Sequence, residues 1–225
     1  ETDNSDRFDA VDISADGKYI AAGSNDYKVY LFHRNNSIPV WTYTTGHEVR
    51  SISISSNGSH ISVGSGNKIY LFAKDSSTPL WTYTSSSWNH TTGSGGISKV
   101  AISKNGGYVA AISNPVVEDS WYGKLYLFDK NHSTPLWNYT GTVIRDVDLS
   151  ADGTHIVTAS PGDGLQLFRR ESSIPLWSYK TPGVEAIVHT DISSDGNYIS
   201  ASSTEVVFFY SGSSTPLWSM PHPHY

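Results

Sequence analysis

Acidic residues recur at equivalent positions in three stretches of alternating apolar residues. Asp12, Asp148 and Asp191 each stand directly before an Ile or Leu that is followed by Ser. Carboxylate oxygens are the ligands that hard cations prefer, so these aspartates are weak candidates for a cation site. The alternative, which we favour, is that they accept hydrogen bonds from backbone amides of neighbouring segments or meet water.

The motifs of nucleophilic, phosphate and zinc chemistry are missing from the sequence. It contains no Gly-x-Ser-x-Gly elbow, no phosphate-binding glycine loop and no His-Glu-x-x-His. The nine histidines are scattered, and the pair His222 and His224 lies in a short tail, where two flexible ligands make a weak metal site. We therefore expect a protein that is not an enzyme and binds no cofactor.

The elements that carry these residues are copies of one short pattern. Residues 47 to 83 contain four apolar runs of period two, separated by turn residues and without a helical period. Five such copies align on an Asx-Gly dipeptide, which predicts a two-residue hairpin turn, and on a Pro-x-Trp sequence near the end. The dipeptides begin at Asp16, Asn57, Asn105, Asp152 and Asp195, and the tryptophans are Trp41, Trp81, Trp137, Trp177 and Trp218.

The spacing of the copies predicts the fold. Successive tryptophans are 40, 56, 40 and 41 residues apart, and a period of about 40–45 residues with four strands per copy indicates the blade of a β-propeller. We expect an all-β protein, a single five-bladed β-propeller of four-stranded antiparallel blades, with no blade shared between the termini. One domain covers residues 1–225, with blades at 8–46, 47–84, 97–142, 143–183 and 184–220 and short polar tails at 1–7 and 221–225.

Two family resemblances follow from the motifs of the copies. The run from His47 to Gly58, then Val63-Gly64-Ser65 and Ile69-Tyr70-Leu71-Phe72, resembles a WD40-type repeat. The run Leu127-Phe128-Asp129-Lys130, with Pro135-Leu136-Trp137 after it, is similar to the tryptophan motif of quinoprotein (PQQ-like) blades. The resemblance covers residues 8–220 and implies a divergent propeller, which we place on a prokaryotic cell surface without carrying over either family's partners or cofactors.

Composition narrows the possible partners. The net charge is −6 and only 16% of the residues are charged, which argues against a nucleic-acid surface and an anionic membrane surface. No apolar run approaches membrane length, and the chain starts with no signal-like segment, so we expect no direct membrane insertion. The absence of cysteine excludes a disulfide framework.

Asparagine sequons favour an extracellular or cell-surface location, with the signal peptide already removed. In a four-stranded antiparallel blade the first and third turns lie on one face of the disc, and three of the sequons fall in such turns. Ordinary turn chemistry is the alternative, because Asn is a common turn residue. The glycosylation candidates are Asn35, Asn57, Asn89, Asn131 and Asn138.

Blade three carries some sixteen extra residues, the difference between the spacings of 56 and 40. They fall in residues 85–96 and 114–123, two neighbouring connections that emerge on the face opposite the first and third turns. Insertions in repeat proteins often form the binding face. We predict the contact site for a protein or glycan there, unless Trp88 and Trp121 simply pack together as a lid. The contact residues would be Trp88, His90, Glu118, Asp119, Trp121 and Tyr122.

The ends of the chain leave two functions open. We expect blades one and five to pack on each other through apolar burial around Phe8 and Trp218, or else an end strand or tail to pair with a neighbouring subunit. The first function is an interaction scaffold that binds protein or glycan through the blade-three loops. The alternative is a structural subunit of a surface layer, sheath or filament that self-associates through propeller faces and termini.

Overall fold

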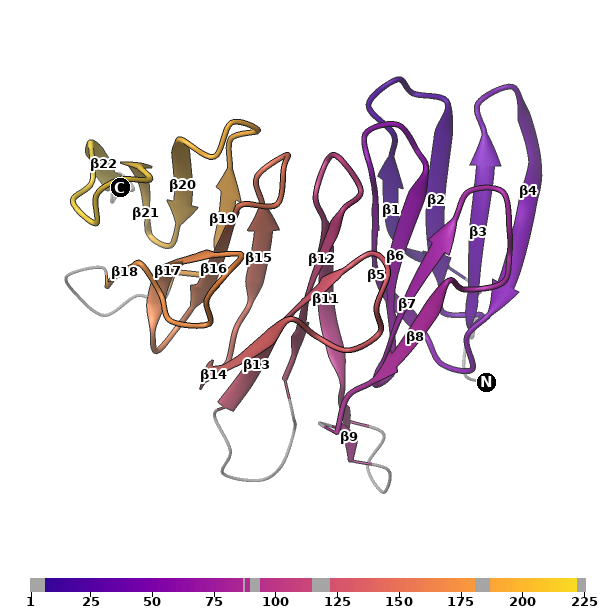
Figure 1. Cartoon of the computed structure of the whole chain (residues 1–225), viewed down its shortest axis with the longest axis horizontal. Coiled ribbons are helices and arrows are strands. Elements are labelled where there is room, and N and C mark those ends of the chain that lie inside the picture. Colours follow the sequence, from indigo (N-terminus) through magenta and orange to yellow (C-terminus); the bar gives the residue numbers. More distant parts are fainter. Residues whose placement is uncertain (1–6, 87, 90–93, 115–121, 181–186, 222–225) are drawn as a thin grey trace.

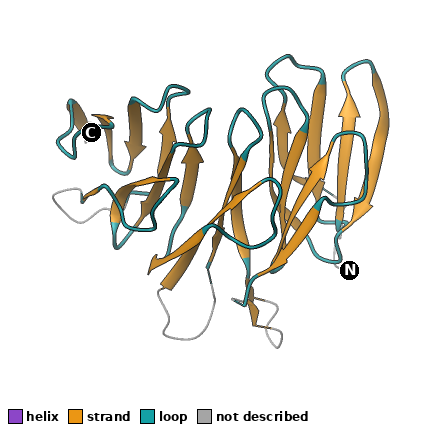
Figure 2. Ribbon diagram, viewed as in Figure 1, coloured by secondary structure: helices purple, strands orange, loops and turns teal. Residues whose placement is uncertain are grey.

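The computed structural model of the chain consists of strands, turns and loops (Figures 1 and 2). It describes residues 7–86, 88–89, 94–114, 122–180 and 187–221, and no helix occurs among them. Five sheets each contain four antiparallel strands in sequence order. The predicted fold class, an all-β five-bladed propeller whose blades are contiguous in sequence, is confirmed.

The first two blades have regular strands of similar length. Blade one comprises β1 (Phe8–Ile13), β2 (Tyr19–Ser24), β3 (Lys28–His33) and β4 (Asn36–Thr44). Blade two comprises β5 (Val49–Ile54), β6 (His60–Ser65), β7 (Lys68–Ala73) and β8 (Trp81–Thr84).

The remaining blades follow the same order. A two-stranded hairpin of β9 (Trp88–Asn89) and β10 (Ser94–Gly95) precedes blade three, which comprises β11 (Ile97–Ile102), β12 (Tyr108–Ser113), β13 (Tyr122–Asp129) and β14 (Trp137–Thr142). Blade four comprises β15 (Asp146–Leu149), β16 (His155–Ser160), β17 (Gly164–Arg169) and β18 (Trp177–Tyr179). Blade five comprises β19 (His189–Ile192), β20 (Tyr198–Ser202), β21 (Glu205–Tyr210) and β22 (Trp218–Pro221).

The first turn of each blade is longer than the predicted two-residue hairpin. In blade one, Ser14 N donates to Tyr19 O (2.9 Å), which leaves a four-residue loop between them. Gly17 has φ +65° there and donates to Ser14 O (2.8 Å). The Asp16 carboxylate accepts from Ser14 Oγ (2.8 Å) and Lys18 N (3.0 Å). The two-residue expectation was wrong because these side chains satisfy the amides of the longer loop.

The core lies between successive blades. Residues that alternate along each strand point toward the preceding blade (the leading face) or toward the following blade (the trailing face). The trailing face of blade one, with Val29 and Leu31, packs against Ile52, Ile54 and Phe72 on the leading face of blade two. Each blade is therefore stabilised by its neighbours, because a single four-stranded sheet cannot bury both of its faces.

A tryptophan joins each blade to the next. Its ring packs on a phenylalanine of the following blade, with centroids 5.2–5.8 Å apart, in the pairs Trp41–Phe72, Trp81–Phe128, Trp137–Phe168 and Trp177–Phe209. Its Nε1 donates to a carbonyl in the third turn of that blade, namely Lys74, Lys130, Arg170 and Ser211 in chain order. The tryptophans are therefore packing residues at the blade junctions, as their fixed position in the repeat indicates.

The expected packing of blade five on blade one is not observed. Phe8 is 60% exposed and Trp218 is 51% exposed. In Figure 1 the indigo blade one and the yellow blade five lie at opposite ends of a fan of blades. The expectation was wrong because the described blades pack only on their neighbours in sequence, and this arrangement leaves the outer faces of blades one and five apart.

Candidate functional site

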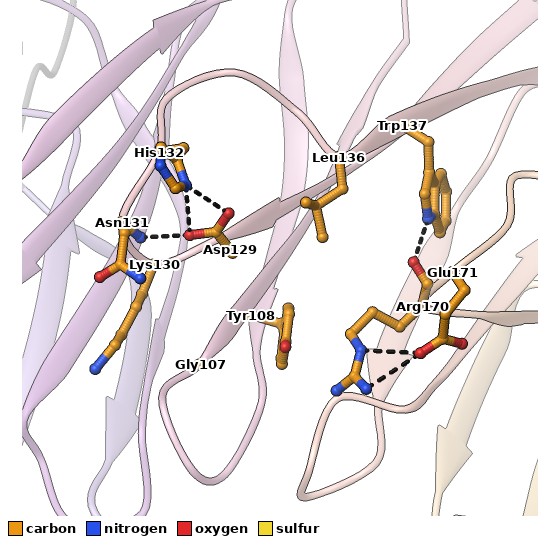
Figure 3. A pocket seen from close by; sticks show the side chains of 10 residues that line it. All are labelled: Gly107, Tyr108, Asp129, Lys130, Asn131, His132, Leu136, Trp137, Arg170 and Glu171. Atoms are coloured by element: carbon orange, nitrogen blue, oxygen red, sulfur yellow. Dashed lines mark hydrogen bonds and ion pairs between the residues drawn. The ribbon is translucent and has the colours of Figure 1, made fainter.

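A hollow of about 610 Å³ opens between blades three and four. It lies on the face from which the first and third turns of the blades emerge, and we call it the turn-face hollow (Figure 3). Its residues come from the first turn of blade three and the third turns of blades three and four. The side chains that shape it are Tyr108, Lys130, His132, Leu136, Trp137 and Arg170.

The Tyr108 ring in this hollow is held by turns of both blades. Tyr108 begins β12 directly after the first turn of blade three, where its amide donates to Ser103 Oγ (3.0 Å). Gly153, in the first turn of blade four, lies so close that a Cβ there would be 2.5 Å from the ring. The aromatic side chain is therefore fixed by the glycine turn of the next blade.

Arg170 places a cation against this ring. Its guanidinium carbon lies 4.7 Å from the Tyr108 centroid, within the range of a cation–π contact. Its Nε is 3.2 Å from Glu171 Oε1, while its backbone oxygen accepts from Trp137 Nε1 (2.6 Å). The side chain is thus anchored at three points, and its position at the rim is set by the blade junction.

Asp129, one of two acidic residues of the hollow, is hydrogen-bonded within its own turn. Asp129 Oδ2 lies 2.7 Å from His132 Nδ1, and its Oδ1 accepts from Asn131 N (2.7 Å). Burial raises the pKa of Asp129, but the hydrogen bonds from His132 and Asn131 outweigh it, and the net pKa is lowered. Asp129 therefore stays ionised and serves the turn.

Lys130 differs from its charged neighbours in the hollow. Among the described residues its ammonium makes no ion pair, while its backbone N donates to Gly107 O (2.9 Å) and its backbone oxygen accepts from Trp81 Nε1 (3.0 Å). The hollow thus combines an aromatic ring, an exposed Leu136 and a cation without a counter-charge. Its lining holds no Ser, Thr or Cys, so the His132–Asp129 pair has no nucleophile to activate there. This arrangement suits binding.

Sequence reasoning did not find the turn-face hollow. Its residues come from turns up to about sixty positions apart, Gly107 to Glu171, and no single motif contains them. A weak signal is present, because four third turns carry a basic residue at the same position. These residues are Arg34, Lys74, Lys130 and Arg170.

The three aspartates predicted as weak cation ligands do not converge. Asp12 Oδ2 accepts from Ile54 N (2.8 Å) and Asp148 Oδ2 from Ile192 N (3.1 Å), so the favoured alternative of amide acceptors is confirmed for both. No group of three metal-ligating side chains occurs among the described residues. Burial, and then the hydrogen bond with Asp191, raises the pKa of Asp148 to about 7.

A fourth aspartate, Asp146, is buried two residues before Asp148. Its carboxylate pairs with Lys99 from blade three and accepts from Thr190 N (3.0 Å) of blade five. It also accepts from Val147 N (2.9 Å). Asp146 therefore ties three blades together and has a structural role.

The predicted contact patch on blade three falls largely outside the described residues. His90, Glu118, Asp119 and Trp121 lie there, and of Trp88 only the backbone, in β9, is described. Tyr122 opens β13 with an exposed side chain. The patch stays a prediction.

The predicted glycosylation candidates are exposed wherever their side chains are described. Asn57 lies in a first turn and Asn35 and Asn131 in third turns, on the turn face, while Asn138 lies on β14. Asn57 Oδ1 accepts from Ser59 N (3.0 Å), which is the turn chemistry weighed as the alternative. Asn89 pairs with Ser94 in the β9–β10 hairpin.

Comparison with known proteins agrees with the repeat geometry. Residues 4–33 and 37–72 match the family described as WD domain, G-beta repeat. The chain is a β-propeller whose first two blades are similar to WD40 repeats. The match covers blade one and the first three strands of blade two, and the other blades repeat their four-stranded order. No curated protein gives a match to the chain.

The family likeness bears on function at a general level. WD40 propellers are typically non-catalytic scaffolds that bind other proteins. The resemblance to quinoprotein blades and the cell-surface location stay predictions. Among the described residues there is no helix of a length and apolarity that could cross a membrane.

Proposed function

We propose that this WD40-like propeller is a non-enzymatic interaction scaffold that holds an extended protein segment in the turn-face hollow. The observation that carries the proposal is that Lys130, whose ammonium makes no ion pair among the described residues, lines the same hollow as the exposed Leu136 and the Tyr108 ring. A carboxylate on a partner would neutralise Lys130, and an apolar side chain next to it would cover Leu136.

The electrostatics favour an acidic segment. Asp129 and Glu171 are engaged by His132 and Arg170, so Lys130 is the basic side chain of the lining that is left to pair with an acidic partner. Ordinary surface ion pairs contribute only about 0–1 kcal/mol, and binding therefore needs the apolar contact as well. The expected ligand is a short segment in which a Leu or Phe is flanked by Glu or Asp.

Fluorescence polarisation with labelled synthetic peptides tests this proposal. Peptides with a central leucine flanked by glutamates should bind the full chain, and the same peptides flanked by lysines should not. Lys130→Glu should reverse this preference, because it inverts the charge but keeps the backbone oxygen that accepts from Trp81.

Lys74→Glu is the matched control. Lys74 holds the same third-turn position in blade two, where its ammonium pairs with Asp75, and it does not line the hollow. Its variant should bind like the unaltered chain. Equal binding of both peptide sets, or equal losses in the two variants, would contradict the proposal.

The extracellular or cell-surface location is part of the proposed function. It is supported by the exposure of Asn35, Asn57, Asn131 and Asn138 on the described surface. Asn131 lines the turn-face hollow, so a glycan there would compete with the protein segment. Asn57 does not line that hollow, so a glycan at Asn57 is compatible with binding there.

A further inference from the structure

The four blade junctions contain hydrogen bonds that run in the same direction along the chain. The two outer faces of the fan carry the unpaired halves of the same contact. At each junction two kinds of hydrogen bond run from the earlier blade to the later one, whereas the inner-strand aspartates Asp12 and Asp148 accept in the opposite sense, from Ile54 N and Ile192 N of the later blade. The Trp Nε1–H always donates forward to the third turn of the next blade. A second bond joins the first turns, from Ala15 N to Ser56 O (2.8 Å), Ser56 N to Lys104 O (2.9 Å), Asn105 N to Ala151 O (3.0 Å) and Ala151 N to Ser194 O (2.9 Å).

The outer face of blade five carries the groups that donate hydrogen bonds at the other junctions. Trp218, the fifth member of the tryptophan series, is 51% exposed, and its ring packs on Phe208 of its own blade at 5.2 Å. The amide of Ser194 holds the position from which Ala15 and Ala151 donate forward. Met220 is also exposed. It holds the position in blade five that Tyr179 holds in blade four, where the Tyr179 ring packs on Phe209 of the next blade.

The outer face of blade one corresponds to the face that accepts hydrogen bonds from the preceding blade at the other junctions. Its leading face exposes Val11 (69%) and Ile13 (55%), whereas the equivalent Ile52 and Ile54 of blade two are 8% and 6% exposed under blade one. No described blade covers these apolar side chains, whose counterparts in blade two lie inside a junction.

A second hollow, of about 460 Å³, lies on this face of blade one. It is lined by Phe32 and Arg34 among others, the counterparts of Phe72 and Lys74. In blade two that phenylalanine stacks with Trp41 at 5.3 Å, and the Lys74 carbonyl accepts from Trp41 Nε1 (2.8 Å). The hollow is thus the place that a tryptophan of a preceding blade occupies at the other junctions.

We propose that a second copy of this chain docks head to tail, with blade five of one copy against blade one of the next. Trp218 of the first copy enters the Phe32 hollow of the second and donates to its Arg34 carbonyl, and Ser194 N–H donates to its Ala15 carbonyl. The contact repeats the chemistry of the four junctions within the chain. The inference goes beyond the proposed function, because it does not use the turn-face hollow.

The arrangement of donors and acceptors selects this orientation. Two blade-five faces would oppose donor to donor at Trp218, and two blade-one faces would oppose carbonyl to carbonyl at Arg34. Only the head-to-tail contact pairs the Trp218 Nε1 and Ser194 N donors with the backbone oxygens of Arg34 and Ala15. Such a heterologous contact leaves one free face at each end, so it builds a closed ring or a filament of several copies.

Analytical ultracentrifugation over a range of concentrations tests the proposal. The unaltered chain should associate as its concentration rises, and Trp218→Ala and Ile13→Asp should each weaken association about tenfold or more. Both residues are exposed in the single copy, so both variants should keep the circular dichroism spectrum of the unaltered chain. Ile174→Ala, a substitution of a 75% exposed residue away from both end faces, should associate normally.

Mixing the two variants tests the polarity. The Ile13→Asp copy keeps an intact blade-five face and the Trp218→Ala copy an intact blade-one face, so the mixture should form a dimer that grows no further. The proposal is overturned by a chain that stays monomeric at every concentration, by association that neither variant weakens, or by Ile13→Asp copies that dimerise alone.

Discussion

The indole Nε1 of Trp177 donates a 2.7 Å hydrogen bond to the backbone oxygen of Ser211 in the next blade. The same ring lies on Phe209, with centroids 5.6 Å apart. One side chain thus supplies both the polar and the apolar contact of a blade junction. Since the pair recurs at four junctions, substitutions at equivalent positions of different blades can serve as controls for one another.

Replacing a junction tryptophan should cost stability only where a following blade is present. Trp81→Phe removes the bond to the Lys130 carbonyl and part of the buried ring, and should lower the free energy of unfolding by about 1–3 kcal/mol. Trp218→Phe, at the exposed end, should change it by less than about 0.5 kcal/mol. Urea unfolding at low protein concentration measures both. Equal losses would contradict the assigned role of the junctions.

Adding a methyl group at the first-turn glycines should distinguish backbone strain from crowding. Gly17→Ala and Gly153→Ala both require a left-handed conformation, at φ +65° and +70°, which costs about 1–2 kcal/mol. Only Gly153→Ala also brings a Cβ to 2.5 Å from the Tyr108 ring, while Gly17 has open space. Gly153→Ala should therefore lose more by at least about 1 kcal/mol, measured by thermal unfolding. A larger loss at Gly17 would refute this.

The Asp148–Asp191 pair should make stability depend on pH. Burial and Asp191 raise the pKa of Asp148 to about 7, from the ordinary value of 3.8, so the folded chain keeps a proton that the unfolded chain releases. The stability from this group is full below about pH 4 and falls as the pH rises to about 7.

Asp148→Asn should flatten that fall and raise the free energy of unfolding above pH 7 by about 1–3 kcal/mol. The measurement is urea unfolding across this pH range. Asp12→Asn, the equivalent change between blades one and two, is the control and should leave the fall in place. An unchanged slope in Asp148→Asn would show that another group causes it.

Glycosylation can be measured directly on protein purified from its native source. If the chain is on the cell surface, peptide mapping by mass spectrometry should find sugars on Asn35, Asn57 or Asn131, which share the turn face. Unmodified peptides at all five sequons would remove this support for the location.

The blade-three patch is tested by a double substitution. Trp88→Ala with Trp121→Ala should reduce binding or assembly if the patch is a contact site. If the two rings only form a lid, the melting temperature falls while binding and assembly stay unchanged.

Much of the fold follows from local signals. The Asx-Gly turns, the alternating strands and the Pro-x-Trp sites predict five contiguous blades because each lies within about forty residues of chain. The conformation of the first turn was missed, since the Ser14 hydroxyl stabilises a longer loop than the Asp16-Gly17 dipeptide alone suggests. The amide-acceptor role of Asp12 was anticipated because a repeat places the same strand beside it in the next blade.

The sequence by itself therefore determined the all-β class, the number of blades and the tryptophan at each junction, because periodicity and turn chemistry act over short stretches of chain. Tertiary structure decided which turns meet and whether the ends meet. Tyr108 and Arg170 come together only through the packing of blade four on blade three. Trp218 is exposed because no described blade packs on the outer face of blade five. Which faces stay uncovered depends on how all five blades are arranged in space, and no pattern within one repeat of about forty residues encodes that arrangement.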